Sequence, residues 1–248
     1  MTTWMSPISS SEVRDGRRSE LAANLKDVRQ RVRAACTAAG RDPGEVTLIA
    51  VTKTWPASDV RLLRELGVRD IGENRDAEAA PKAAACADLD IAWHFVGQLQ
   101  TNKCRSVAQY AAVVHSVDRQ RLVRALGAAA RREGRTVTCL VQVNLDPDTY
   151  GSGRGGVAPD GAVALGKAVA GEPGLRLGGV MAVAPLGSAP GAAFARLAEC
   201  AGKVREAEPS ATAISAGMSG DLEEAIEFGA THLRIGTALL GKRELRVM

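Results

Sequence analysis

The sequence predicts an α/β fold, a single closed (β/α)8 barrel preceded by an extra N-terminal helix. Eight short runs rich in β-branched residues alternate with segments of helical periodicity, which is typical of parallel strands joined by helices. The chain has 248 residues, a length that such barrels commonly use as one domain. Apolar residues make up 46% but aromatic residues only 3%, so we expect a core of mainly Ala, Val, Leu and Ile.

The N-terminal region divides into two parts. Residues 1–18 are Ser- and Arg-rich and lack the apolar core of a signal peptide, so we expect a disordered tail. The barrel domain is then expected over residues 19–248. Its first helix starts near Ser19 and ends at Gly40, because apolar side chains follow helical spacing at Leu21, Leu25, Val28, Val32 and Ala35.

The strands and helices are predicted from these patterns in turn. Each strand is a short apolar run bounded by turn residues. The predicted strands are Val46–Thr52, Val68–Gly72, Ile91–Gly97, Val113–Val117, Val137–Asn144, Leu175–Val183, Ala211–Ala216 and His232–Gly236. The clearest helical stripes between them are at Ser58–Leu66, Asp118–Arg132 and Ala189–Glu206, with Ser58 and Asp118 as expected N-caps.

Polar residues follow nearly every predicted strand. The chemistry of such barrels gathers at the C-terminal ends of the strands, so these residues define a candidate ligand-binding mouth. They are Lys53, Gly72-Glu73-Asn74, His94 to Gln98, Gln142-Val143-Asn144, Gly217 to Asp221, and Arg234 to Thr237.

Lys53 lies where the first strand leaves the core. A partly buried lysine can lose its proton and become a nucleophile that forms a Schiff base. The simpler interpretation is a lysine that ends a strand and points into solvent. The polar residues at the other strand ends favour the interpretation of Lys53 as a nucleophile.

Two glycine-containing loops predict a phosphate site. Gly217-Met218-Ser219-Gly220 precedes a helix that begins near Leu222, and Gly236-Thr237 follows the eighth strand. Free backbone N–H groups and a helix N-terminus bind phosphate, and the loops after strands seven and eight of such barrels often do so. Ser219 alone fits an ordinary N-cap equally well. Arg234 has small or apolar neighbours, so we expect an inward guanidinium rather than a surface ion pair. Together with Lys53, these features suggest pyridoxal 5′-phosphate (PLP).

Six segments carry a more specific resemblance. They are Ala50 to Thr54, Ile71 to Asn74, Trp93 to Lys103, Gly179 to Ala182, Gly217 to Ser219, and Arg234 to Gly241. In this order and spacing they resemble the pyridoxal phosphate homeostasis protein family, whose fold is that of the alanine racemase N-terminal barrel. One departure follows Asn74, where the family commonly has a bulky residue and then Gln-Glu. Here Arg75 to Glu78 retains only the final acid.

The resemblance assigns roles to eight residues. It implies that Lys53 holds PLP as a Schiff base and that Arg234 faces the pyridine nitrogen. The other residues would contact the phosphate or the ring: Ser219, Gly236 and Thr237 at the phosphate with Met218 beside them, and Asn74 and His94 near the ring. A strand histidine satisfied by packing is the alternative for His94.

The resemblance also implies a function in intracellular PLP homeostasis, without strong catalytic activity. A protonated arginine keeps the pyridine nitrogen unprotonated, which makes the ring a poorer electron sink. A PLP-dependent amino-acid racemase or lyase is the alternative, and racemisation needs a second base. The tyrosines are Tyr110, in a predicted helix, and Tyr150, in the loop Leu145–Gly156, which we interpret as a lid or partner-contact loop. A Schiff-base aldolase on a phosphorylated substrate is more remote, because we find no acid/base pair around Lys53.

Composition limits the partners and the compartment. The net charge is +4, but no basic block carries interleaved aromatics, so nucleic-acid binding is not expected. No run approaches the roughly 18 apolar residues of a membrane span. Five scattered cysteines indicate reduced thiols and a cytoplasmic protein. We expect a monomer, because no second domain follows the barrel, with apo-PLP enzymes as transient partners.

Overall fold

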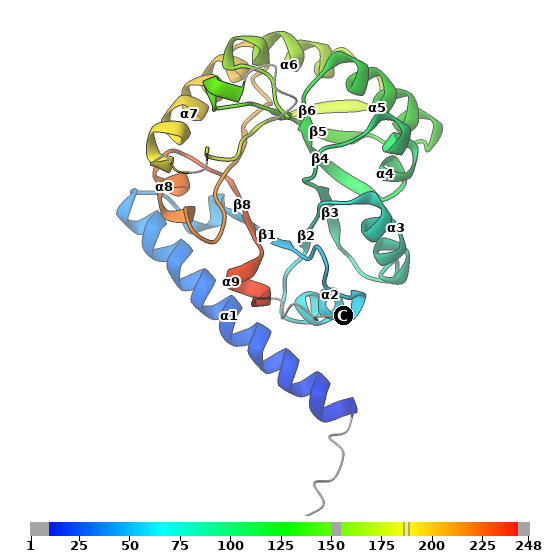
Figure 1. The fold of residues 1–248 in the computed structure, drawn as a ribbon, viewed down its shortest axis with the longest axis vertical. Helices are drawn as coiled ribbons and strands as arrows, with labels where there is room; N and C mark the ends of the chain where they lie inside the picture. The colour runs from blue at the N-terminus through cyan, green and yellow to red at the C-terminus, as the bar shows by residue number, and fades with distance from the viewer. Residues whose placement is uncertain (1–9, 150–154, 186, 188, 243–248) are drawn as a thin grey trace, which may run out of the picture.

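Eight parallel strands close into a barrel in which each strand pairs with the next and β8 pairs with β1 (Figure 1). The structure is a computed structural model that describes residues 10–149, 155–185, 187 and 189–242. The strands are β1 Thr47–Val51, β2 Asp70–Glu73, β3 Ala92–Phe95, β4 Ala111–Val117, β5 Val137–Gln142, β6 Leu175–Met181, β7 Ala213–Ser215 and β8 His232–Ile235. The predicted (β/α)8 barrel is therefore confirmed.

Helices surround the barrel. They are α1 Ser10–Ala38, α2 Ala57–Glu65, α3 Asp76–Ala85, α4 Cys104–Tyr110, α5 Gln120–Arg132, α6 Ala162–Ala170, α7 Pro190–Ala207, α8 Leu222–Glu227 and α9 Thr237–Leu240. Short 3-10 turns occupy Pro43–Glu45, Thr101–Lys103, Pro147–Thr149 and Pro159–Gly161. Among the described residues, no helix is long and apolar enough to cross a membrane.

The predicted strand limits agree with the observed ones to within one or two residues. The predicted side-chain caps are wrong. Helix α2 begins after Pro56 without a side-chain cap, and α5 begins after Arg119. Asp118 does not cap α5 because its carboxylate pairs with the guanidinium of Arg119.

The prediction of a tail over residues 1–18 is wrong from Ser10 onward, because α1 begins there; residues 1–9 lie outside the described chain. The physical reason is a set of tertiary partners for the basic side chains of this segment. Arg17 pairs with Asp59 of α2 at 2.7 Å and stacks on the ring of Trp55 at 4.3 Å. Such contacts hold a polar helical segment that propensity alone would leave frayed.

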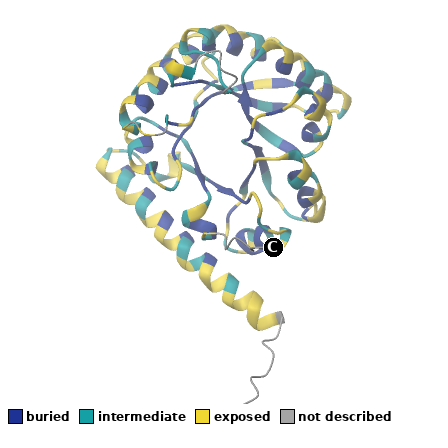
Figure 2. Ribbon diagram, in the orientation of Figure 1, coloured by how far each residue is buried: buried dark blue, intermediate teal, exposed yellow. Residues whose placement is uncertain are grey.

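The core has two layers, one inside the barrel and one between the strands and the helices. Figure 2 shows the strands as mostly buried and the outer faces of the helices as exposed. The apolar stripe of α1 is buried as predicted, with Leu21, Leu25, Val28 and Val32 all under one tenth exposed. All five cysteines are buried and free, which agrees with reduced thiols.

Candidate functional site

A cavity of about 380 Å³ opens at the C-terminal ends of the strands. Its lining residues are Val51, Lys53, Asn74, Val96, Met181, Val183, Met218, Ser219, Gly220, Arg234, Gly236 and Thr237. Seven of the eight residues predicted for the site are in this set, and His94 is not. They come from the ends of β1, β2, β7 and β8, so the closed barrel brings together residues separated by up to most of the chain length.

Lys53 lies two residues beyond the end of β1 and is exposed in the cavity. The turn that carries it is held in an unusual conformation, because Thr54 adopts φ 69°, a left-handed value that costs a non-glycine residue about 1 kcal/mol. The N–H of Thr54 donates to Oε2 of Glu78 in α3 at 2.9 Å. Glu78 is the acid retained from the family pattern, and its carboxylate fixes the turn behind Lys53.

The β7–α8 loop presents backbone donors to the cavity. Gly217 starts it at φ +87°, where a Cβ would lie 2.6 Å from Ala225 Cβ, so this turn requires glycine. The N–H of Met218 donates to Asp221 Oδ1 at 2.6 Å. No described residue accepts from the N–H of Ser219 or Gly220. Those two donors remain available to an anion.

Ser219 joins the two predicted phosphate loops. Its Oγ accepts a hydrogen bond at 3.1 Å from the N–H of Ala238, in the first turn of α9, which follows the β8 loop. The hydroxyl can still donate its own proton to an anion. Ser219 is thus a bridge between the loops rather than a cap of α8, which has no side-chain N-cap.

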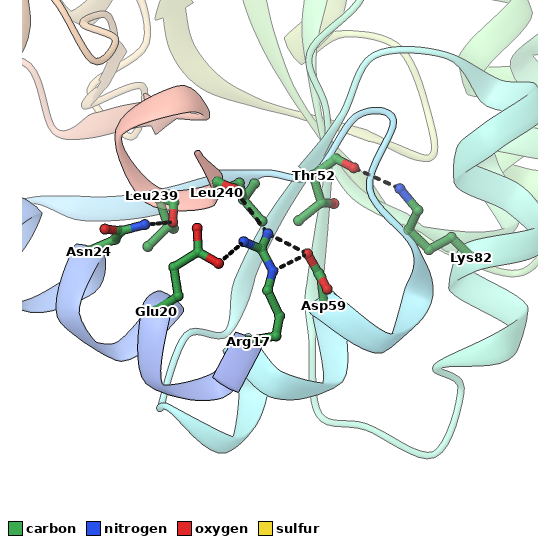
Figure 3. A network of polar contacts seen from close by, with 8 residues as sticks. All are labelled: Arg17, Glu20, Asn24, Thr52, Asp59, Lys82, Leu239 and Leu240. Carbon is green, nitrogen blue, oxygen red and sulfur yellow. Dashed lines mark hydrogen bonds and ion pairs between the residues drawn. The ribbon is translucent and has the colours of Figure 1, made fainter. Parts of the chain in front are cut away.

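Helix α1 holds the β7–α8 loop and the short helix α9 from outside the barrel. Arg31 donates to the carbonyl oxygen of Ser219 at 3.0 Å and makes two bonds of 2.8 Å with Glu223. Asn24 and Arg17 donate to the carbonyls of Leu239 and Leu240, each at 3.0 Å, as Figure 3 shows. These contacts of α1 cannot be recognised from local sequence patterns, because their partners lie far away along the chain.

The hydrogen bonds of Arg31 to Ser219 and Glu223, which we call the Arg31 clamp, lead to a testable prediction. An Arg31→Met variant loses the bonds to Ser219 and Glu223, so the β7–α8 loop is less ordered and binds an anion more weakly. We expect PLP affinity to fall about fivefold, as for the loss of roughly 1 kcal/mol of hydrogen bonding. Arg33→Met is the matched control, because Arg33 lies on the same helix but faces a hollow at the other end of the barrel. Equal affinities for the two variants would exclude the clamp.

Arg234 is a buried cation at the base of the cavity, only 6% exposed. Its guanidinium donates to Ser215 Oγ at 2.7 Å and to the carbonyl of Ala182 at 2.8 Å. No carboxylate within the described parts of the chain forms an ion pair with it. Burial lowers the pKa of Arg234 to about 10, with Asp221 opposing, so the group stays charged at neutral pH. A buried charge without a counter-ion is costly unless a ligand interacts with it.

Two apolar side chains on the rim of the cavity are exposed. Met218 is 39% exposed and Val183 42%, and both line the cavity. A flat apolar ligand would cover them. Among the described residues, no cluster of His, Cys, Asp or Glu could hold a metal ion.

His94 lies deeper, inside the barrel, and is 3% exposed. Its ring nitrogens contact Asp70 and His115 instead of facing the cavity. Its position fits the alternative of a histidine satisfied by its surroundings. Glu73, another predicted strand-end residue, faces the helices, where it contacts Lys82 and Thr52.

Known proteins resemble this chain over most of its length. The alanine racemase N-terminal domain family matches residues 19–244. The pyridoxal phosphate homeostasis protein of Pseudomonas aeruginosa is 43% identical over 229 residues, 91% of this chain and 97% of the relative. The protein of that name from Mycobacterium bovis is 42% identical over 246 residues, 93% and 95%. The structure of PipY from Synechococcus elongatus with PLP bound has a TM-score of 0.77 at 33% identity, covering 89% of this chain and 100% of PipY. The chain therefore belongs to the pyridoxal phosphate homeostasis protein family, with the fold of the alanine racemase N-terminal domain.

Proposed function

We propose that this protein binds PLP reversibly on Lys53 and acts in intracellular PLP homeostasis, holding the cofactor and releasing it to apo-enzymes. The observation that carries the proposal is Arg234, a buried cation that forms no ion pair with any described residue, in one cavity with a lysine and free N–H donors. The names of the relatives and the PLP in the PipY structure support the same ligand.

The residues present fit each part of the cofactor. The amine of Lys53 suits its aldehyde, and the N–H groups of Ser219 and Gly220 suit its phosphate. Gly236 and Thr237 complete the phosphate side, and the exposed side chain of Met218 suits the edge of the ring. Bound PLP supplies an aldehyde for covalent attachment and a ring that can accept electron density.

Arg234 determines how well the ring of bound PLP could stabilise a carbanion. Because it stays protonated, it would donate a hydrogen bond to the pyridine nitrogen of bound PLP and would leave no proton there. Asn74, which directly follows β2, is expected to contact the face of the ring. A ring without a proton on its nitrogen stabilises a carbanion poorly, which favours storage over catalysis.

The cavity also offers few groups for proton transfer. Lys53 is the only general base among the described lining residues. Tyr110 lies at the end of α4, where burial raises the pKa of its hydroxyl and where that hydroxyl lies 3.4 Å from Asp76 Oδ1. Tyr150, the other candidate, lies outside the described residues. A racemase needs two bases, and an aldolase needs an acid/base pair beside its lysine. We infer a carrier rather than either enzyme, and expect a cytoplasmic monomer.

Two assays on the PLP-loaded protein test this function. It should activate the apo form of a PLP-dependent transaminase, and it should not racemise alanine or serine faster than free PLP does. Turnover that rises in proportion to protein concentration would overturn the carrier interpretation. Failure to activate the apo-enzyme, with the yellow complex intact, would leave no support for delivery.

A further inference from the structure

Five polar side chains form a continuous line of hydrogen bonds through the barrel interior. Asp70 Oδ1 lies 3.0 Å from His94 Nε2, and His94 Nδ1 lies 2.9 Å from His115 Nε2. His115 Nδ1 lies 2.9 Å from Ser215 Oγ, which accepts from Arg234 at 2.7 Å. The line crosses from β2 and β3 through β4 to β7 and β8. It ends in the cation of the PLP cavity.

Of the two ends of the line, the Asp70 end, away from the cavity, is the one exposed to solvent. The side chain of Asp70 is 30% exposed and borders a hollow of about 460 Å³ at the opposite end of the barrel. His94, His115, Ser215 and Arg234 are each less than one tenth exposed. A buried polar network of this kind is costly unless every donor has an acceptor, so its hydrogen positions are determined by its ends.

The two ends impose one direction. Arg234 can only donate and ionised Asp70 can only accept. Ser215 therefore accepts from Arg234 and donates its hydroxyl proton to His115 Nδ1. His115 then carries its proton on Nε2 and donates to His94 Nδ1. His94 in turn carries its proton on Nε2 and donates to Asp70.

This arrangement of donors and acceptors requires each imidazole to carry a single proton. The surroundings of His115 keep its ring in that neutral form. Burial lowers the pKa of His115 well below its ordinary value, and the nearby groups His94, Arg234 and His232 lower it further. Every donor and acceptor along the line is then used once. Without the acceptor at Asp70, the protons of both rings could move from Nε2 to Nδ1. Ser215 would then receive two donors, and its own proton would have no acceptor within the line.

We propose that Asp70, His94, His115 and Ser215 are positioning residues that orient the guanidinium of Arg234 toward the PLP ring from the opposite end of the barrel. The proposal rests on PLP binding in the cavity but goes beyond it, because none of the four lines the cavity. Asp70 is the informative residue, because it lies at the opposite end of the barrel and this line of hydrogen bonds connects it to Arg234.

The first test uses the protein without PLP. The chain has three histidines, so ¹⁵N NMR of the imidazoles resolves each tautomer. We expect Nε2–H for His94 and His115 in the wild type and in Asp70→Asn, which keeps an acceptor oxygen. In Asp70→Leu we expect Nδ1–H for both rings. Wild-type tautomers in Asp70→Leu would overturn the proposal.

The second test measures the visible absorption band and the affinity of PLP. Asp70→Leu is expected to shift the band and weaken binding about tenfold, and Asp70→Asn should restore both. His232→Asn is the matched control, because this ring lies 6.4 Å from those of His94 and His115 without bonding to either. Ser215→Ala cuts the line at its other end and should give the same loss if Asp70→Leu does not fold.

The outcomes separate the two proposals. A wild-type protein that forms no visible complex contradicts PLP binding itself, and the tautomers measured without PLP then still show whether Asp70 directs the line. A normal wild-type complex with an unchanged band and affinity in Asp70→Leu and Ser215→Ala contradicts the positioning role alone.

Discussion

A Lys53→Ala variant is expected to fold normally and to lose the covalent PLP complex. Lys53 is exposed and makes no hydrogen bond or ion pair with a described residue, so its removal should change the free energy of unfolding by no more than about 0.5 kcal/mol. The phosphate donors of the β7–α8 loop remain. PLP should therefore bind weakly and reversibly, with affinity lower by about a hundredfold or more, or ~3 kcal/mol.

The measurement is a titration with PLP followed by dialysis, monitored by the visible band. The wild type should keep the band after dialysis and Lys53→Ala should lose it. Lys103→Ala is the matched control, because Lys103 borders a neighbouring hollow that shares Asn74 with the cavity. A band that survives dialysis in Lys53→Ala, or disappears in Lys103→Ala, would place the attachment elsewhere.

A Lys82→Met variant is expected to be destabilised by about 3–5 kcal/mol, the cost of removing one partner of a buried ion pair. Lys82 of α3 donates to Glu73 Oε1 and to the carbonyl of Thr52, the residue before Lys53. Glu73 is fully buried, and its Oε2 has no hydrogen-bond partner among the residues that the structure describes. Without Lys82 the carboxylate would keep only the hydroxyl of Thr52.

The loss should depend on pH in a defined direction. Burial raises the pKa of Glu73, against the opposing hydrogen bonds of Lys82 and Thr52. An acid whose folded pKa is raised binds more protons when folded. Its contribution to stability is therefore full below its unfolded pKa of about 4.5 and declines as pH rises through the folded pKa. Loss of Lys82 raises that pKa further, so the variant should lose more stability at pH 8 than at pH 5.

Urea unfolding at the two pH values checks this expectation. The double variant Glu73→Gln, Lys82→Met removes the charge, keeps an acceptor for Thr52, and should recover most of the stability at both pH values. An equal loss at pH 5 and pH 8, without recovery in the double variant, would show that packing and not the unpaired carboxylate is responsible.

The fold and most of the site could be predicted from local patterns. Parallel strands covered by helices are continuous apolar runs, and turn residues mark both their ends, so all eight strands could be located. Lys53 and Ser219 lie two and four residues beyond the ends of such strands, and Arg234 is the penultimate residue of another. Their convergence in one cavity follows from closure of the barrel, because all eight C-terminal strand ends lie on one rim.

The errors have two physical causes. Strand parity places Glu73 outside the barrel, because side chains alternate along a strand and Glu73 shares its face with buried Ile71. This signal was available in the sequence. His94 does point into the barrel, but it lies below the cavity, where it contacts Asp70 and His115. The helical state of residues 10–18 was not predictable in the same way, because Arg17 depends on Asp59 and on the carbonyl of Leu240. The same holds for the clamp by Arg31.

The central claim is covalent attachment of PLP to Lys53. The most direct test is to load the purified protein with PLP, reduce it with borohydride and locate the modified lysine by peptide mass spectrometry. We predict one stoichiometric pyridoxyl adduct on Lys53 and a yellow protein before reduction. A colourless protein, or an adduct spread over several lysines without preference for Lys53, would contradict the account.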